Sequence, residues 1–184
     1  MTLAEFRRTY PTATLTVSSG KLFTYRYYQN PLAKATLVLL TGGIGLSDLF
    51  YKHFARFAGD FSVLTFDYQI QFGDNGEFAD AVAELLHCLK EKAWLVGQSL
   101  GGVVAQIIAA RHPEVVEGLV LSNTCSLSGS MSETGYQDLM KMIESQRKFK
   151  KWLAFLPFPL IKRMMGWAVM KKKTDGFTAQ EKAA

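Results

Sequence analysis

A serine stands between glycines in the stretch Gly97-Gln98-Ser99-Leu100-Gly101-Gly102. The apolar residues 93–96 before this stretch predict a buried strand, and the apolar run 103–110 after it predicts a helix. A Gly-x-Ser-x-Gly turn between a strand and a helix is typical of a nucleophile elbow, in which strained backbone lifts a serine hydroxyl above the end of a sheet. The sequence therefore predicts Ser99 as a nucleophile.

The residues around the serine have predicted roles of their own. Gly97 and Gly101 must let the strand and the helix come into contact, where any side chain would collide. Leu100 follows the serine, so its N–H lies at the N-terminus of the predicted helix and can donate to a developing oxyanion. The turn thus supplies both a nucleophile and one oxyanion donor.

The elements that position this turn are predicted from the hydrophobic pattern. Residues 12–17 and 21–28 alternate and predict two antiparallel strands joined by a turn at 18–20. A continuously apolar run at 35–40 predicts a strand covered on both faces, residues 61–66 predict another buried strand, and residues 115–121 predict a last strand. Helices are predicted at 47–58, capped by Ser47 or Asp48, and at 77–91. This alternation predicts an α/β fold with a mostly parallel sheet and helices on both faces.

Small and polar residues follow the predicted parallel strands. Thr41-Gly42-Gly43, Asp67, Ser99 and Asn123 all come where a strand ends. Ligands of such sheets bind at the carboxyl ends of the strands, so we expect the site there, with Gly42, Gln98 and Asn123 in contact with substrate.

Charge and composition limit the classes of function. The net charge is +5, but residues 147–173 hold nine of the 21 Lys and Arg and no acidic residue, which leaves 12 basic against 16 acidic residues, or −4, elsewhere. A localised basic segment argues against a nucleic-acid-binding face across the fold. Residues 1–11 lack the apolar region of a signal peptide, and Pro157, Pro159, Lys162 and Arg163 interrupt the most apolar late stretch. We therefore expect a cytoplasmic protein.

No metal or cofactor is predicted. Asp67, Asp74 and Glu77 cluster around one loop, but no His or Cys joins them. Cys88 and Cys125 have no metal-ligand spacing and are expected to be reduced thiols.

Taken with these motifs, residues 12–125 resemble the α/β-hydrolase superfamily. The resemblance is carried by Thr41-Gly42-Gly43-Ile44-Gly45, Phe66-Asp67, the turn around Ser99, and Ala109-Ala110-Arg111-His112-Pro113-Glu114 leading into Gly118-Leu119-Val120-Leu121. The first motif looks like the family's His-Gly-Gly-Pro-Gly oxyanion segment, with Thr and Ile in place of His and Pro. The resemblance implies Ser99 as nucleophile, the N–H groups of Leu100 and Gly43 as the oxyanion hole, and a lid beginning after about residue 126.

One feature departs from the family pattern. The family places an acid and then a His after the serine, whereas His53, His87 and His112 fall within or at the end of predicted helices, and Asn123 stands where some relatives carry the acid. Three interpretations follow: the chain is the N-terminal part of a longer enzyme, which we favour, the missing half comes from another polypeptide, or the protein is a non-catalytic descendant.

The sequence thus predicts an incomplete α/β-hydrolase-like core over residues 1–125 and an incomplete helical lid segment over 126–184. The predicted function is a serine hydrolase acting on a small carboxylic ester or related acyl compound through an acyl-enzyme on Ser99; the alternative is a truncated or non-catalytic protein without the acid and His. The basic, aromatic stretch 147–173 is interpreted as part of the lid, with contact to an anionic membrane surface as the alternative. An apolar strand edge predicts self-association.

Overall fold

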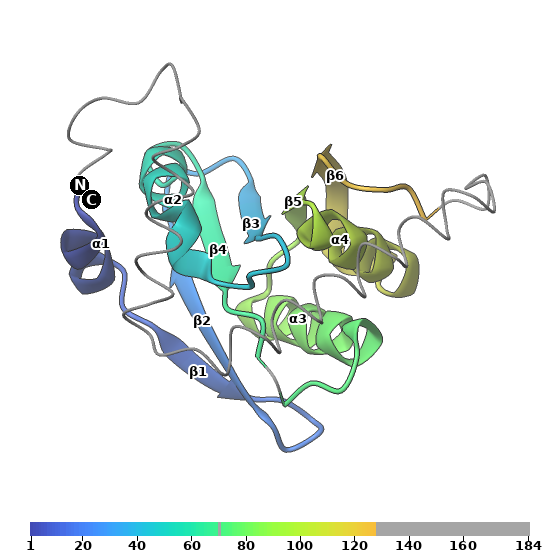
Figure 1. Ribbon diagram of the computed structural model, residues 1–184. Coiled ribbons are helices and arrows are strands. Elements are labelled where there is room, and N and C mark those ends of the chain that lie inside the picture. The colour runs from blue at the N-terminus through green and yellow to red at the C-terminus, as the bar shows by residue number, and fades with distance from the viewer. Residues whose placement is uncertain (70, 128–184) are drawn as a thin grey trace, which may run out of the picture. The chain divides into compact units, whose positions relative to one another are not determined.

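The computed structural model describes residues 1–69 and 71–127, which lie within a compact unit of residues 1–129 (Figure 1). The predicted lid beyond residue 127, including the basic stretch 147–173, lies outside the described residues. The described strands are β1 (Ala13–Thr16), β2 (Leu22–Tyr28), β3 (Thr36–Leu40), β4 (Ser62–Phe66), β5 (Ala93–Gln98) and β6 (Val116–Ser122). The described helices are α1 (Leu3–Thr9), α2 (Tyr51–Phe57), α3 (Asn75–Leu89) and α4 (Leu100–Arg111), with 3₁₀ turns η1 (Ser47–Phe50) and η2 (Pro113–Val115).

The strands form one sheet in the order β1-β2-β4-β3-β5-β6. The pairs β1–β2 and β2–β4 are antiparallel, and the remaining pairs are parallel. In the register of β3 and β5, Leu40 lies opposite Gly97, so the last residue of β3 is beside the glycine that opens the serine turn. The predicted α/β fold with a mostly parallel sheet is confirmed.

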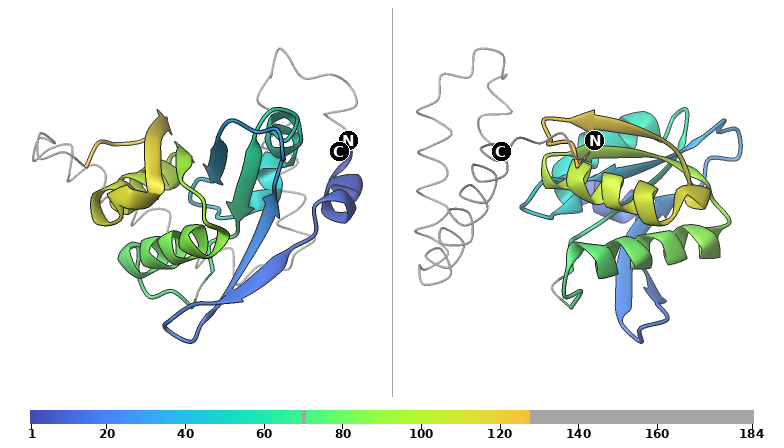
Figure 2. Two further views of the ribbon diagram at one scale, coloured as in Figure 1. Left: turned by 180° about the vertical axis from the view of Figure 1, so that it is seen from behind. Right: turned by 90° about the vertical axis from the view of Figure 1, so that its right-hand side faces the viewer.

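Helices cover both faces of the sheet, as predicted (Figures 1 and 2). On the face of α3 and α4, the core contains four phenylalanines whose rings contact one another, Phe23, Phe66, Phe72 and Phe78. On the face of α1 and α2, a second core joins Phe6 and Phe54 to Leu39 and Val63. Every residue of β3 and β4 is buried, which explains why these two strands are mostly apolar and do not alternate.

Helix α1 was not predicted. Its N-cap Thr2 accepts a hydrogen bond from the Glu5 N–H at 3.3 Å, and Glu5 accepts one from the Thr2 N–H at 2.7 Å. This reciprocal pair is a capping box, whose Thr-x-x-Glu spacing is a signal that the sequence contains. Phe6 then anchors the helix, because its side chain is fully buried.

The prediction that Ser47 or Asp48 caps the second helix is wrong. The chain first makes the 3₁₀ turn η1, and neither its start nor that of α2 has a side-chain cap. Asp48 instead binds two arginines, Arg7 at 2.8 Å through Nε and Arg26 at 3.5 Å through Nη2. The Asp48 carboxylate is thus bonded to guanidinium groups rather than to the N–H groups of a helix N-terminus.

Within the described residues, no helix is both long enough and apolar enough to cross a bilayer. Trp94 on β5 and Val120 and Leu121 on β6 remain exposed. The self-association predicted from this edge of the sheet stays a prediction.

The Phe23 ring is central to the larger core, with ring centroids 5.2 Å from Phe66 and 5.6 Å from both Phe72 and Phe78. We expect Phe23→Ala to lower the free energy of unfolding by about 3–5 kcal/mol, because it leaves a cavity among these rings. Urea denaturation measures this loss. Leu22→Ala is the matched control: Leu22 is the neighbouring residue but is 57% exposed, so an equal loss in both variants would contradict the packing described.

Candidate active site

Ser99 lies at the sharp turn between β5 and α4, with φ 53° and ψ −120°. This combination is rare for a residue with a side chain, and it lies outside the left-handed helical region that such residues tolerate best. Two backbone hydrogen bonds hold it, from the Ser99 N–H to the Ser122 carbonyl and from the Gly102 N–H to the Ser99 carbonyl, both 3.0 Å long. The turn is therefore a strained one that the surrounding structure keeps in place.

The glycines of the turn lie where backbones touch. A Cβ on Gly97 would be 2.5 Å from the Gly101 carbonyl oxygen, and a Cβ on Gly101 would be 2.2 Å from the Leu40 carbonyl oxygen. Both distances are shorter than van der Waals contact allows. The predicted steric role of these two glycines is confirmed.

The loop Thr41–Gly45 follows β3 and passes beside Ser99. A Cβ on Gly42 would be 2.7 Å from Gln98 Oε1 and 3.4 Å from Ser99 Cβ. The structure thus brings Gly42, Gln98 and Ser99 together, as the sequence predicted for residues at the carboxyl ends of β3 and β5. The apolar side chains of Ile44, Leu46 and Leu49 follow along the same segment and are exposed.

The segment after β6 closes the turn from the other side. Thr124 donates a hydrogen bond from Oγ1 to the Ser99 carbonyl at 2.7 Å, and its side chain fills the space that a Cβ on Gly102 would need. Asn123 directly precedes it, is exposed and has φ 48°. Asn123 therefore lies just after the carboxyl end of β6, as predicted. The contact with the serine turn is made by Thr124, which was not predicted. Its only signal in the sequence is its position just after a strand.

The three histidines of the chain contact other groups. His112 Nε2 lies 2.7 Å from Asp80 Oδ1, and His87 Nε2 lies 3.4 Å from Glu114 Oε1. His112 follows the C-terminal end of α4, a helix of 12 residues whose N-terminal end is at Ser99, so it lies about 18 Å along the helix from the serine. His53 on α2 is exposed, and its ring packs edge-on against Phe50. Among the described residues, no hydrogen bond joins a histidine to Ser99.

The acidic residues that cluster in the sequence have separate structural roles. Asp67 Oδ1 accepts a hydrogen bond from the Ser47 N–H at 2.7 Å, which ties the end of β4 to the segment after the glycine loop. Asp74 caps α3 by accepting from the N–H groups of Gly76 and Glu77. Glu77 pairs with Lys21, and this pairing lowers its carboxyl pKa.

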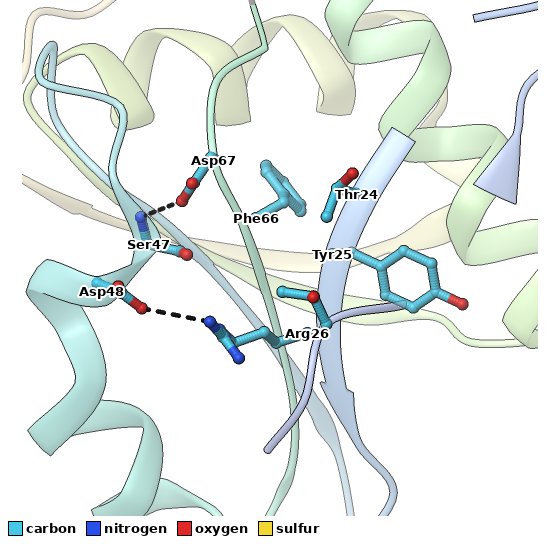
Figure 3. A pocket seen from close by; sticks show the side chains of 8 residues that line it. Thr24, Tyr25, Arg26, Ser47, Asp48, Phe66 and Asp67 are labelled. Carbon is cyan, nitrogen blue, oxygen red and sulfur yellow. Dashed lines mark hydrogen bonds and ion pairs between the residues drawn. The ribbon is translucent and has the colours of Figure 1, made fainter. Parts of the chain in front are cut away.

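A small polar cavity of about 50 Å³ lies beside Asp67 and Ser47 rather than at Ser99 (Figure 3). Arg26 extends from β2 along it to Asp48, donates to the Tyr10 carbonyl and stacks 5.2 Å above the Phe6 ring. These contacts join α1, β2 and η1. The cavity therefore lies among the contacts that hold the segment after the glycine loop, and not at the serine.

This sheet order, with a strained serine after β5 and a glycine loop after β3, defines a hydrolase-type α/β fold. The sequence model of the alpha/beta hydrolase fold matches residues 35–171, and the chain belongs to this family.

Comparison with individual proteins finds similarity to proteins named as hydrolases. It is 28% identical over 123 residues to "Putative carbamate hydrolase RutD" of Agrobacterium fabrum (strain C58 / ATCC 33970), a match that covers 61% of this chain and 47% of that protein. A second protein of that name, from Pantoea ananatis (strain LMG 20103), is 28% identical over 122 residues, with 59% of this chain and 43% of that protein covered. The chain thus spans about half the length of the curated relatives it matches.

Solved structures share the fold. A hydrolase from Pseudomonas aeruginosa PA01 has a TM-score of 0.58 at 23% identity and covers 83% of this chain and 62% of its own. Carboxylesterase CesB (YbfK) from Bacillus subtilis has a TM-score of 0.55 at 22% identity, with 73% and 52% covered.

The contact between Gly101 and β3 leads to a first prediction for this site. We expect Gly101→Ala to lower the free energy of unfolding by about 1–3 kcal/mol or more, because the added methyl group meets a backbone carbonyl that cannot rotate away. Gly59→Ala is the control, since a Cβ on Gly59 would have its nearest neighbour at 3.6 Å. Urea denaturation of the two variants compares them. Equal stability would mean that α4 does not pack as closely on β3 as described.

The ion pair between α3 and α4 leads to a pH prediction. Arg111 donates two hydrogen bonds to Asp80, of 2.8 and 2.7 Å, and with His112 it lowers the pKa of the Asp80 carboxyl from its ordinary value of 3.8. Because the pKa is lower in the folded state, this pair stabilises the fold above pH 3.8 and the stabilisation is lost as pH falls through the folded-state pKa.

We therefore expect Asp80→Asn to lower the urea midpoint at neutral pH and to match the wild type at a pH low enough to protonate Asp80 in the folded protein. Glu117→Gln is the control, because Glu117 is exposed and forms no ion pair with any of the described residues. If the difference in urea midpoint between Asp80→Asn and the wild type were the same at neutral and at acidic pH, the charge of Asp80 would not stabilise the fold.

Proposed function

We propose that this chain carries the nucleophile of a serine hydrolase, which cleaves a carboxylic ester or related acyl compound through an acyl-enzyme on Ser99. The observation that carries the proposal is the strained Ser99 backbone between β5 and α4, with Gly42 packed beside it. Strain of about 1–3 kcal/mol at one residue persists only when the surrounding structure holds it, and it concentrates at functional sites.

The proposed reaction has two steps. Ser99 Oγ attacks the acyl carbon while its proton passes to a general base, and the acyl oxygen becomes an oxyanion. The N–H groups of Leu100 and Gly43 are the proposed donors to this oxyanion. The leaving group departs with the proton, and water then hydrolyses the ester on Ser99. Gly42, Gln98 and Asn123 are the proposed substrate contacts around the serine.

The general base is the group that the described residues do not supply. His112 and His87 are paired with carboxylates, and His53 packs on Phe50. A serine hydroxyl is a weak nucleophile without a base. The proposal therefore includes a base from protein outside these 184 residues, either a further segment of the same polypeptide or a second chain.

The chemistry of similar proteins supports the substrate class. A carbamate hydrolase and a carboxylesterase are among the proteins that this chain resembles. Carbamates and carboxylic esters both present a carbonyl carbon that bears a leaving group, and both pass through a tetrahedral oxyanion. The exposed Ile44 in the glycine loop, with Leu46 and Leu49 just after the loop, favours a substrate with an apolar part.

The competing proposal is a non-catalytic protein that keeps the turn but has no base. The placement of the three histidines favours it, because each is engaged away from Ser99. Reactivity of Ser99 distinguishes the two proposals.

We expect a fluorophosphonate probe to label the full-length protein at Ser99, because serine Oγ displaces fluoride from phosphorus only when a base and oxyanion donors activate it. Labelling is measured by gel fluorescence and located by peptide mass spectrometry. Ser99→Ala should lose the label, and the control Ser19→Ala, at an exposed turn position, should keep it.

Wild-type labelling no stronger than that of Ser99→Ala would reject the hydrolase and favour the non-catalytic protein. If the 184-residue chain alone hydrolysed a p-nitrophenyl ester through Ser99, the external base would be ruled out instead.

A further inference from the structure

Tyr68, two residues after β4, bonds to both ends of the glycine loop Thr41–Gly45. Its hydroxyl donates to the Thr41 carbonyl at 2.6 Å, and its N–H donates to the Gly45 carbonyl at 2.8 Å. The loop closes on itself between these points through a 2.9 Å hydrogen bond from the Gly45 N–H to the Gly42 carbonyl. Tyr68 is therefore hydrogen-bonded to both the first and the last residue of the loop.

The side chain of Tyr68 is itself held rigidly. Its ring packs edge-on against Phe78 of α3, with centroids 5.1 Å apart, and Phe78 belongs to the larger core. Gly45 lies directly against the base of the ring, since a Cβ on Gly45 would be 2.8 Å from Tyr68 Cβ. The hydroxyl is thus fixed relative to the sheet, so that it can fix the loop in turn.

The Thr41 carbonyl lies between two of the elements that form the site. It accepts from Tyr68, and a Cβ on Gly101, in the first turn of α4, would be 2.6 Å from its oxygen. The peptide unit that joins Thr41 to Gly42 is planar and trans, so its C=O and N–H point in opposite directions. By fixing this carbonyl, the Tyr68 hydroxyl also fixes the direction of the Gly42 N–H, at the residue that packs beside Ser99.

Tyr68 donates as a neutral phenol. Burial raises the pKa of its phenol well above the ordinary value of 10.0, so the hydroxyl keeps its proton. Asp67, the neighbouring residue, holds only the later segment at Ser47 and is exposed. Tyr68 therefore bonds to both ends of the loop, whereas the Asp67 carboxylate bonds beyond it.

We propose that Tyr68 is a positioning residue, which holds the Gly42–Gly43 backbone against Ser99 in the geometry that receives the oxyanion. This inference rests on the proposed hydrolase function. It assigns to Tyr68 an effect on the chemical step rather than on substrate affinity, because the hydroxyl acts through the loop and does not need to touch the substrate.

The test compares Tyr68→Phe with Tyr27→Phe in the full-length protein. Tyr27 on β2 also donates one hydroxyl hydrogen bond, to Glu91 at 2.5 Å, and Glu91 lies before β5, at the end of the sheet opposite Ser99. Both variants lose one hydroxyl and keep the ring. We expect Tyr68→Phe to lower kcat for p-nitrophenyl butyrate about tenfold with KM changed less than about twofold, since small losses of alignment slow the reacting step.

The second measurement does not depend on catalysis. Hydrogen–deuterium exchange of the Gly45 amide, which closes the loop, should accelerate in Tyr68→Phe and stay at the wild-type rate in Tyr27→Phe. The proposal is overturned if either kcat or the exchange rate of Tyr68→Phe equals that of Tyr27→Phe. A wild-type protein that hydrolyses the ester no faster than Ser99→Ala would instead contradict the proposed function, and this result is separate from any difference between the two tyrosine variants.

Discussion

The contact of the α4 N-terminus with the end of β3 is the constraint on which the described site depends. Gly101 meets the Leu40 and Thr41 carbonyls at distances that leave no room for a Cβ. The missing Cβ of Gly101 sets how closely the helix approaches the sheet, and therefore where Ser99 lies. The glycine loop leaves β3 at the same point, so one steric contact places both the serine and the backbone beside it.

Hydrophobic pattern and the glycine-bordered serine were enough to predict the fold. Strands β3 and β4 are buried on both faces, and such strands are recognised by apolar runs alone. Gly97 and Gly101 could be assigned from the motif, because the close approach they allow is a local property of the turn. Helix α1 is also encoded locally, in the spacing of Thr2 and Glu5, and was missed although its signal was present.

Other parts of the site depend on contacts between distant segments, which a single sequence does not display. Asp48 has the right type and position for a helix cap, but its carboxylate faces the buried Arg26 of β2. Tyr68 and Thr124 reach the loop and the turn only after the sheet has brought β3, β4, β5 and β6 side by side. The residue types allow these bonds, and the topology decides which are made.

The strained serine is tied to residues that come later in the chain. Its N–H is bonded to the Ser122 carbonyl, and its own carbonyl accepts from Thr124. During synthesis, β5 and α4 therefore leave the ribosome before Ser122 and Thr124, which make two of the hydrogen bonds that hold Ser99 at positive φ. The full set of hydrogen bonds at the serine turn therefore requires β6 to be paired with β5, so the geometry of the nucleophile depends on a strand that comes after it in the chain.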